Sequence, residues 1–405
     1  MLVCFVLGNG CLFSWNSMLT IEDYYVYLFP KNHPTRVLTP VYQSFALRVT
    51  ALLTYHEAKI NTRLRILTGY TLFFLSSFAI IILDVATKGQ GGVGEFVGVC
   101  VISAAFGIGD AHVQGGMVGD LSLMCPEFIQ SYLAGLAASG AITSALRLIT
   151  NAAFESSRDG LRKGAMLFFS ISCFFELLCV LLYTSVFPTL PIVKYYRSKA
   201  ASEGSKTVAG DLAAAGVPTG EDEIVEEEPE RYERLSSKQL LLQNMDYALY
   251  IFLTYVLTLS IFPGFLSEDT GSHSLGPWYA LVLIAMYNVW DLIGRYVPFI
   301  VKMTSRKCIT AAALASFILV LFHCKVWRSR IYDRFDVLPG VEQRVSNRLC
   351  PYGGAQGIKG KFTSAIPLAV SCFQGPEQNA LGNVLVVFLL IGLFSGVVHD
   401  WLWLR

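Results

Sequence analysis

Charge is the component that this sequence has least of. Its 405 residues include 31 Lys and Arg and 30 Asp and Glu, so only 15% are charged. A soluble domain carries about a quarter charged residues. With 54% hydrophobic residues and a mean hydropathy of +0.51, the chain cannot coat a soluble surface. The net charge of +1 leaves no basic excess for nucleic acid, so we expect no nucleic-acid partner.

Signatures of enzymes and metal sites are also missing. The ten cysteines form no CxxC pair and no His/Cys cluster with metal spacing, so they are interpreted as small apolar packing residues. The six histidines never occur as a close pair. Neither a phosphate loop, nor G-x-S-x-G, nor H-E-x-x-H is present. We therefore expect no enzymatic activity, no cofactor and no metal.

Long apolar runs dominate what is present. A membrane-spanning helix needs about 20 mainly apolar residues. Runs that meet this need, or approach it, predict an all-α integral membrane protein with about ten clear spans. They are Met1–Ile21, Val37–His56, Ile66–Leu83, Phe96–Gly119, Phe128–Leu146, Gly164–Val193, Tyr247–Ser267, Ser274–Val301, Cys308–Phe322 and Asn379–Val398.

A mixed-charge segment separates the sixth run from the seventh. Lys194–Asp246 includes Glu221–Glu230, which has seven acids in ten positions. Such a segment cannot bury enough apolar surface to fold alone. The sequence thus predicts an N-terminal six-helix bundle (1–193), a disordered cytoplasmic linker (194–246) and a C-terminal bundle (247–405).

The orientation follows from basic residues near the span ends, which mark the cytoplasmic side. Both ends of the linker are basic, which places it inside. Alternation then puts the second-to-third loop inside as well, in agreement with Lys59, Arg63 and Arg65. The fifth-to-sixth loop disagrees, because its basic residues fall outside: Arg158, Arg162 and Lys163. We keep the alternation because most loops support it.

The eighth span contains the best candidate constellation. Asn288, Asp291 and Arg295 follow an i, i+3, i+7 pattern and share one helix face. Charged groups inside a bilayer are costly and usually face the bundle interior. Asp291 and Arg295 could form a buried ion pair that locks two helices. Alternatively, this face exchanges hydrogen bonds with the hydroxyls of a hydrophilic substrate.

The fourth span is interrupted by polar residues. Gln114 offers two donors and an amide oxygen, which suits the edge of a heterocyclic base, although a bond to a neighbouring helix is as good an explanation. Asp110 shares a face with Gln114, and with His112 it could relay protons or form a plain buried pair. The spacing Gly115-x-x-x-Gly119 allows close helix approach.

Three further features lie in other spans. Trp15, near the outer end of the first span, is either an interfacial belt residue or a stacking wall for a planar ligand. Arg48 lies within the second span with no evident partner. The fifth span repeats small residues every four positions, which predicts a packing face: Ser131, Gly135, Ser139 and Thr143.

Together these segments resemble the equilibrative nucleoside transporter family, most closely its plant branch. The residues that carry the resemblance are LGNGCLFSWN (7–16), AHVQGGMVGD (111–120), NVWDLIGR (288–295) and GPEQNALGN (375–383). The match covers roughly residues 1–320 and 375–405. In that family a chain normally begins upstream of a residue like Met1, and a small residue is expected where Arg48 stands.

The resemblance implies a fold and an activity. The fold is a major-facilitator-like bundle of eleven helices, six plus five, around a central cavity. The activity is movement of purine and pyrimidine nucleosides across a membrane by alternating access. The carrier would be facilitative or proton-coupled, and the plasma membrane is the expected location. The partners are then nucleosides, the lipid bilayer and, if transport is coupled, protons.

The resemblance also assigns roles residue by residue. It places Trp15 and Leu19 beside the substrate and Gln114 against the base. Asp291 and Arg295 would contact the ribose hydroxyls, with Asn288 supporting them. If transport is proton-coupled, we expect the acids at membrane depth, Asp110 or Glu176, to carry the proton.

Alternatives remain open at this stage. The same fold could carry another small polar solute such as a sugar, and a membrane-embedded enzyme or receptor is a third class. The chain could also be a defective carrier, because 323–374 is aberrant: His323–Lys361 carries eight Lys and Arg and no apolar run. Phe322–Gly357 can be encoded by codons that, in the reading frame one base later, specify an uncharged stretch. This stretch resembles the family's tenth helix. Lys361–Gln374 would then be translated intron.

Overall fold

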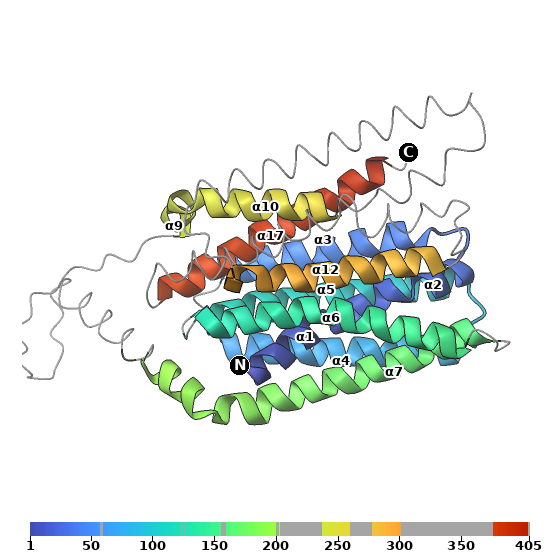
Figure 1. Ribbon diagram of the computed structural model, residues 1–405, viewed down its shortest axis with the longest axis horizontal. Helices are drawn as coiled ribbons and strands as arrows, with labels where there is room; N and C mark the ends of the chain where they lie inside the picture. The colour runs from blue at the N-terminus through green and yellow to red at the C-terminus, as the bar shows by residue number, and fades with distance from the viewer. Residues whose placement is uncertain are drawn as a thin grey trace, which may run out of the picture.

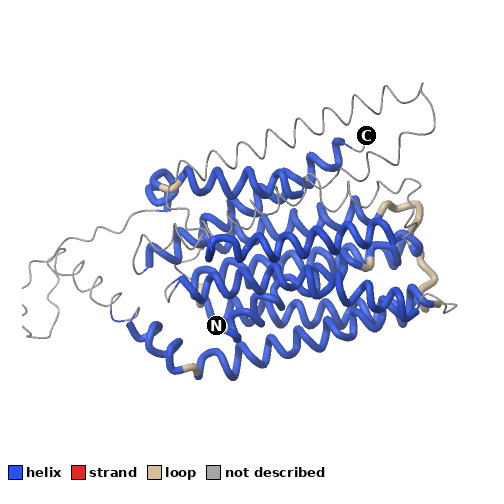
Figure 2. The backbone as a smooth tube through the Cα atoms, viewed as in Figure 1, coloured by secondary structure: helices blue, strands red, loops and turns tan. Residues whose placement is uncertain are grey.

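A computed structural model describes residues 1–56, 60–122, 124, 126–154, 159–199, 202, 237–259, 278–300 and 376–403. Every secondary-structure element in these ranges is helical (Figure 2). The α-helices with defined bounds are α1 (Leu2–Thr20), α2 (Glu22–Leu28), α3 (Pro34–Tyr55), α4 (Thr62–Thr87), α5 (Val93–Ser122), α6 (Pro126–Phe154), α7 (Gly160–Leu181), α9 (Ser237–Gln243), α10 (Met245–Leu259), α12 (Trp278–Ile300) and α17 (Pro376–Trp403).

Six of the described helical segments are long and apolar enough to cross a membrane. They lie in α1, α4, α5, α6, α7 with its continuation, and α17. Each coincides with a span predicted from the sequence. Helices α3 and α12 have 22 and 23 residues, so they too are long enough to cross, at about 1.5 Å per residue. The predicted all-α integral membrane fold is confirmed.

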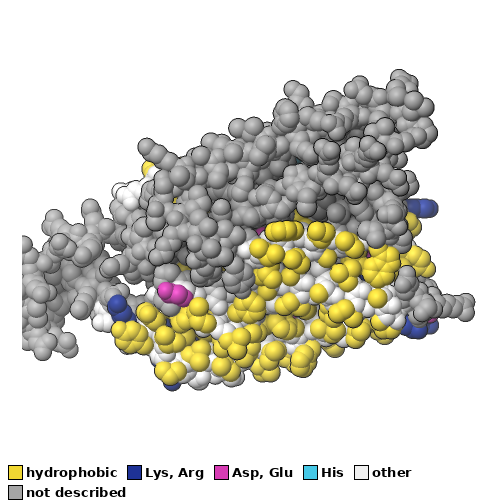
Figure 3. All heavy atoms as spheres, viewed as in Figure 1, with side chains coloured by type: hydrophobic (Ala, Val, Ile, Leu, Met, Phe, Trp, Pro, Cys, Tyr) yellow, Lys and Arg dark blue, Asp and Glu magenta, His cyan; other side chains and the backbone are white. Residues whose placement is uncertain are grey.

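The described surface has the character expected of a protein in lipid. In Figure 3, hydrophobic side chains cover the middle of the face, and the charged ones lie toward its ends. Exposed apolar residues on α6 and α7 include Ile142, Ile149, Phe174 and Leu181. An apolar belt of this kind is stable only where hydrocarbon replaces water.

The predicted sixth span does not continue as one α-helix. After Leu181 the chain passes through a π-helical turn (Leu182–Val186) and a 3-10 turn (Phe187–Thr189). Pro188 cannot donate to the helical ladder, which accounts for the change of winding. A helix at 191–199 and α9 then occupy the two ends of the predicted linker. Residues 203–236, the predicted span Cys308–Phe322 and the aberrant stretch 323–374 lie outside the described residues.

Glycines bring α1 and α6 into direct backbone contact. A Cβ on Gly8 would lie 2.0 Å from the carbonyl oxygen of Tyr132, and one on Gly135 would lie 2.1 Å from that of Phe5. No side chain fits at either position without a shift of backbone. Gly135 belongs to the small-residue repeat of the fifth span, so the predicted packing face is confirmed.

The C-terminal helices meet the N-terminal bundle at two different places (Figure 1). Helix α12 packs against α6, whereas α17 packs against α3 and α5. Helix α10 lies on α17. The described helices after the linker therefore contact the N-terminal bundle through α3, α5 and α6.

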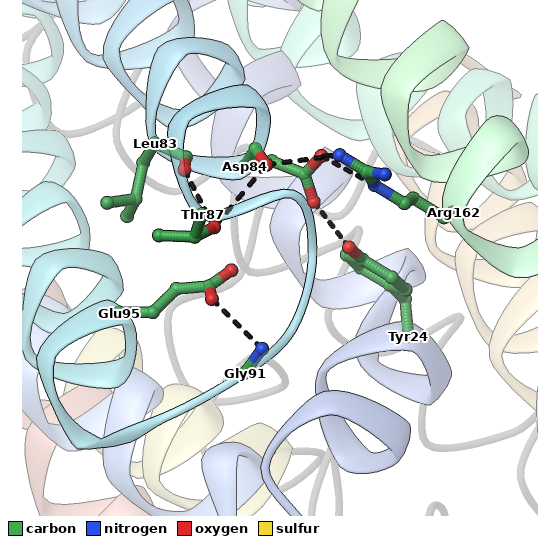
Figure 4. A network of polar contacts seen from close by, with 7 residues as sticks. All are labelled: Tyr24, Leu83, Asp84, Thr87, Gly91, Glu95 and Arg162. Atoms are coloured by element: carbon green, nitrogen blue, oxygen red, sulfur yellow. Dashed lines mark hydrogen bonds and ion pairs between the residues drawn. The ribbon is translucent and has the colours of Figure 1, made fainter.

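One end of the bundle is fastened by a cluster around Asp84, which we call the outer clamp because alternation predicts this end to be external (Figure 4). Tyr24 donates to one oxygen of the Asp84 carboxylate, and Arg162 donates to the other at 2.9 Å. Burial and the Asp84 carboxylate raise the pKa of Tyr24, so its hydroxyl remains a donor. The clamp joins α2, α4 and α7.

The outer clamp also explains the loop that disagreed with the predicted orientation. Arg162, counted there as an external positive charge, forms an ion pair with Asp84. A second arginine at the end of α6, Arg147, pairs with Asp23 of α2. A neutralised arginine carries little weight in orienting a span, so Arg162 does not oppose the alternation.

Gly135→Ala should destabilise the protein by about 1–3 kcal/mol, because the added methyl group forces α1 and α6 apart. The matched control is Gly94→Ala on α5, where a Cβ would meet nothing within 4 Å. Thermal unfolding of the two variants in detergent, each compared with the parent protein, measures the difference. Equal stability of the two variants would show that the α1–α6 contact is not tight.

Candidate functional site

The aromatic wall of the candidate site is formed by α1 and α3. Trp15 is 6% exposed, and its ring stacks on that of Tyr42 with a centroid distance of 3.9 Å and an interplanar angle of 16°. An interfacial belt residue would face lipid and headgroups, so that interpretation of Trp15 is wrong. Leu19, one turn further along α1, is also buried.

Asp110 of α5 lies behind this aromatic pair. The Cys11 thiol of α1 donates to its carboxylate at 3.5 Å, and the Tyr42 hydroxyl neighbours the same carboxyl group. His112 instead uses its Nδ1 for the carbonyl of Ile108 at 2.8 Å. Residues two apart on a helix point in different directions, so Asp110 and His112 form no direct pair, and a proton relay through them stays a prediction.

Gln114 follows Asp110 by one turn and is 7% exposed. Its amide oxygen Oε1 is buried and accepts no hydrogen bond within the described structure. The amide oxygen thus forms no bond to the described helices, and the role of Gln114 toward a base stays a prediction. A buried acceptor without a donor costs free energy, and a ligand with an N–H group would satisfy it.

Arg65 connects the N-terminal bundle with the last helix. It is 5% exposed and donates to the side-chain oxygen of Asn383 on α17 and to the Ala111 carbonyl on α5, each at 3.0 Å. Gly115 makes room for its guanidinium group. Our assignment of Arg65 to a cytoplasmic loop is wrong, because Asn61 caps α4 and Arg65 already lies inside that helix.

Helix α6 brings α1 and α12 to neighbouring positions. Asn16, next to Trp15, donates to the Ser139 hydroxyl at 2.6 Å, and Asn288 of α12 donates to the Ser144 hydroxyl at 2.8 Å. A Cβ on Gly140 would lie 2.6 Å from the Asn288 oxygen. Ser139, predicted to serve only packing, thus holds Asn16, and Ser144 of the same helix holds the candidate substrate-binding amide Asn288.

Asp291 is buried on α12, less than one turn beyond Asn288. The backbone of Arg295 belongs to the same helix, but its side chain lies outside the described residues. The predicted pairing of Asp291 with Arg295 therefore stays a prediction.

Glu176 occupies a different environment from these residues. It is fully buried on α7, and its Oε1 accepts from the Ser14 hydroxyl at 2.7 Å. Ser14 also contacts Ser77 and Ser172, at 2.9 and 3.1 Å. Glu176 thus lies beside a group of hydroxyl side chains that comes from α1, α4 and α7.

The sequence analysis missed four residues of this arrangement: Tyr42, Arg65, Ser144 and Asn383. Tyr42 stands in a predicted span with no feature that separates it from packing residues, and Asn383 belongs to the motif 375–383 without any sign of its partner. A signal existed for Arg65, since it lies one residue before a predicted span. A polar residue bonded across 318 positions leaves no local pattern, so only the fold reveals it.

Comparison with known proteins gives this geometry its context. Residues 97–343 match the sequence profile of the family described as nucleoside transporter. The chain belongs to that family. Equilibrative nucleotide transporter 3 of Arabidopsis thaliana is 57% identical over 407 residues, covering all of this chain and 94% of the relative. Equilibrative nucleotide transporter 2 of the same plant is 54% identical, with 99% and 94% covered. The predicted family and plant branch are confirmed.

Solved structures support the predicted architecture. The structure of the major-facilitator proton:xylose symporter XylE covers 99% of this chain and 87% of its own, with a TM-score of 0.62. A double-tryptophan mutant of the same symporter gives a TM-score of 0.63. At 13% identity this likeness concerns the fold alone, and it confirms the major-facilitator-like bundle.

Ser144→Ala should raise the half-saturating nucleoside concentration about 2- to 12-fold, because Asn288 loses a hydrogen-bond partner worth about 0.5–1.5 kcal/mol. Ser131→Ala, on the same helix, serves as the control, since the Ser131 hydroxyl bonds only to the Met1 carbonyl. Concentration-dependent uptake by both variants at matched expression measures the effect. A shift of equal size in the two would assign Ser144 to general packing.

Proposed function

We propose that this protein carries purine and pyrimidine nucleosides across the plasma membrane by alternating access. Membership of the nucleoside transporter family and the major-facilitator-like fold establish a nucleoside carrier. The site, the substrate range and the membrane are our proposals. The observation that carries the site is the buried amide oxygen of Gln114, which accepts no hydrogen bond from the described residues.

The chemistry of a nucleobase fits the two buried groups of the N-terminal bundle. A base presents a flat apolar face, which stacks on an aromatic ring, and an edge with N–H donors. Trp15 offers the ring and Gln114 offers the unsatisfied acceptor. Leu19 supplies further apolar surface on the same helix as Trp15.

The ribose would bind at α12. Asp291 accepts hydrogen bonds from hydroxyl groups, and Arg295 donates to them. Asn288, held by Ser144, orients this helix face toward the N-terminal bundle. With the base on one bundle and the sugar on the other, a bound nucleoside would draw the two together, as a carrier that alternates its access requires.

Arg65 fits the same mechanism as a latch between bundles. Its hydrogen bonds to Asn383 and Ala111 join α4, α5 and α17 at the end predicted to be cytoplasmic. For the substrate to leave on that side, α17 must separate from α4, which breaks the bond to Asn383. Because the guanidinium also holds the Ala111 carbonyl, it keeps an acceptor after the separation.

Uptake by vesicles that contain the full chain tests the function. Radiolabelled uridine and adenosine should enter, whereas a pentose sugar and a nucleoside monophosphate should not compete with them. Gln114→Ala should weaken apparent binding by about 0.5–1.5 kcal/mol, roughly 2- to 12-fold in half-saturating concentration. Asp291→Asn should reduce uptake more strongly, because it removes the acceptor charge expected at the ribose.

Gln90→Ala changes an exposed amide and is the control for Gln114→Ala. Surface expression is measured for every variant. Competition by the sugar at the concentration where uridine competes would favour the alternative of a sugar carrier. Unchanged kinetics of Gln114→Ala would show that this amide is structural.

The alternative of a defective carrier has its own test, which is sequencing of the transcript across codons 322–374. If that alternative holds, the transcript has a reading frame that restores an apolar stretch in place of the eight Lys and Arg of His323–Lys361. If instead the transcript encodes these residues as they stand and the protein shows full uptake, the coding-error hypothesis is wrong.

A further inference from the structure

Within the predicted spans of the N-terminal bundle, two buried acids lie outside the described ion pairs, which join Arg147 to Asp23, Arg162 to Asp84 and Arg197 to Asp120. The two acids are Asp110 and Glu176. A carboxylate inside a membrane is costly without a cation, so each has reason to bind a proton. What surrounds them differs, and this difference separates their roles.

Asp110 is linked to both groups proposed to bind the base. Its neighbour Tyr42 stacks on Trp15, and Gln114 follows it by four residues on the same face of α5. A movement of Trp15 toward a base would move Tyr42, and with it the hydroxyl beside the Asp110 carboxyl. Binding of the base and the charge on Asp110 therefore act on the same side chains.

The groups that face Asp110 cannot compensate its charge. The titratable neighbours are Cys11 from α1, Tyr42 from α3 and Tyr132 from α6, all neutral groups. Of these, the Cys11 thiol donates to the Asp110 carboxylate, whereas the two tyrosine hydroxyls form no hydrogen bond with the described residues. Arg65 from α4 reaches α5 but donates to Asn383 of α17 and to the Ala111 carbonyl. Gain or loss of one proton at Asp110 consequently changes the charge of the site by a full unit.

Glu176 lacks such a connection. Its described hydrogen bond comes from Ser14, which in turn contacts Ser77 and Ser172. These serines belong to helices of the N-terminal bundle alone, so none of them reaches α12 or α17. A change of charge there would strain the interior of one bundle without acting on the substrate side chains.

We propose that Asp110 is the proton-binding group that couples nucleoside movement to a proton gradient, and that Glu176 is a neutral structural acid. The inference rests on the proposed nucleoside function. A proton from the more acidic side binds one oxygen of the Asp110 carboxylate to give the neutral acid, and no other bond breaks. The new O–H then has the Tyr42 oxygen as an acceptor, which sets the ring behind Trp15. Release of the proton on the other side restores the carboxylate.

The test is uridine uptake by liposomes containing the full chain, measured between about pH 5 and about pH 8 outside, with and without a protonophore. Uptake by the wild-type protein should rise as the outside pH falls, and the protonophore should abolish the rise. Asp110→Asn, which cannot ionise, should bring the ratio of uptake at the lowest and highest pH to about one. Glu176→Gln should keep the wild-type ratio.

Each contrary result is informative. A wild-type pH response in Asp110→Asn, or its loss in Glu176→Gln, would overturn the assignment. Wild-type uridine uptake that ignores pH and the protonophore would overturn proton coupling while leaving the nucleoside function intact. Absence of nucleoside uptake at every pH would instead refute the proposed function itself.

Tyr42→Phe provides an independent test should Asp110→Asn fail to reach the membrane. It keeps the ring that stacks on Trp15 and removes only the hydroxyl beside Asp110. The pH midpoint of uptake should move upward by about half a unit or more, because the ionised carboxyl loses a neighbouring donor. An unchanged pH midpoint would show that Tyr42, and with it Trp15, does not influence proton binding at Asp110.

Discussion

The direct backbone contact between α1 and α6 is the constraint on which the rest of the site depends. Gly8 and Gly135 allow an approach that any side chain would prevent. Because α6 occupies one side of α1 so closely, the remaining sides of α1 reach α3, α5 and α7, where Cys11, Ser14 and Trp15 find their partners. A helix without any Asp, Glu, Lys, Arg or His thus contacts both Asp110 and Glu176, and its position decides what each of them touches.

The sequence allowed most of the described spans and several buried polar positions to be predicted, because both depend on local composition. An apolar run long enough to cross the membrane is visible without the fold, and so is an amide such as Gln114 or Asn288 within that run. Their burial is confirmed, and their role toward a substrate remains a prediction. Tyr42 and Arg65 could not be recognised, because their significance comes from Trp15 and Asn383, which lie elsewhere in the chain.

The membrane orientation of the spans is also difficult to predict from the charged residues of the sequence alone. A rule that counts lysines and arginines treats each as a free cation near the membrane surface. Arg162 contributes to that count in the sequence but shares its charge with Asp84, which comes from a different helix. A loop that seems to violate the rule can therefore mark an ion pair between span ends, and the apparent exception becomes information about packing.

The hydrogen bond from Arg65 to Asn383 has a consequence for how the chain is made. The ribosome completes the first six spans long before it reaches α17, so during that interval the buried guanidinium lacks its acceptor on the last helix. Any chain that stops early keeps this incomplete polar contact at membrane depth, where factors that survey nascent membrane proteins can detect it. One hydrogen bond of Arg65 is therefore completed only when the carboxyl-terminal helix is in place.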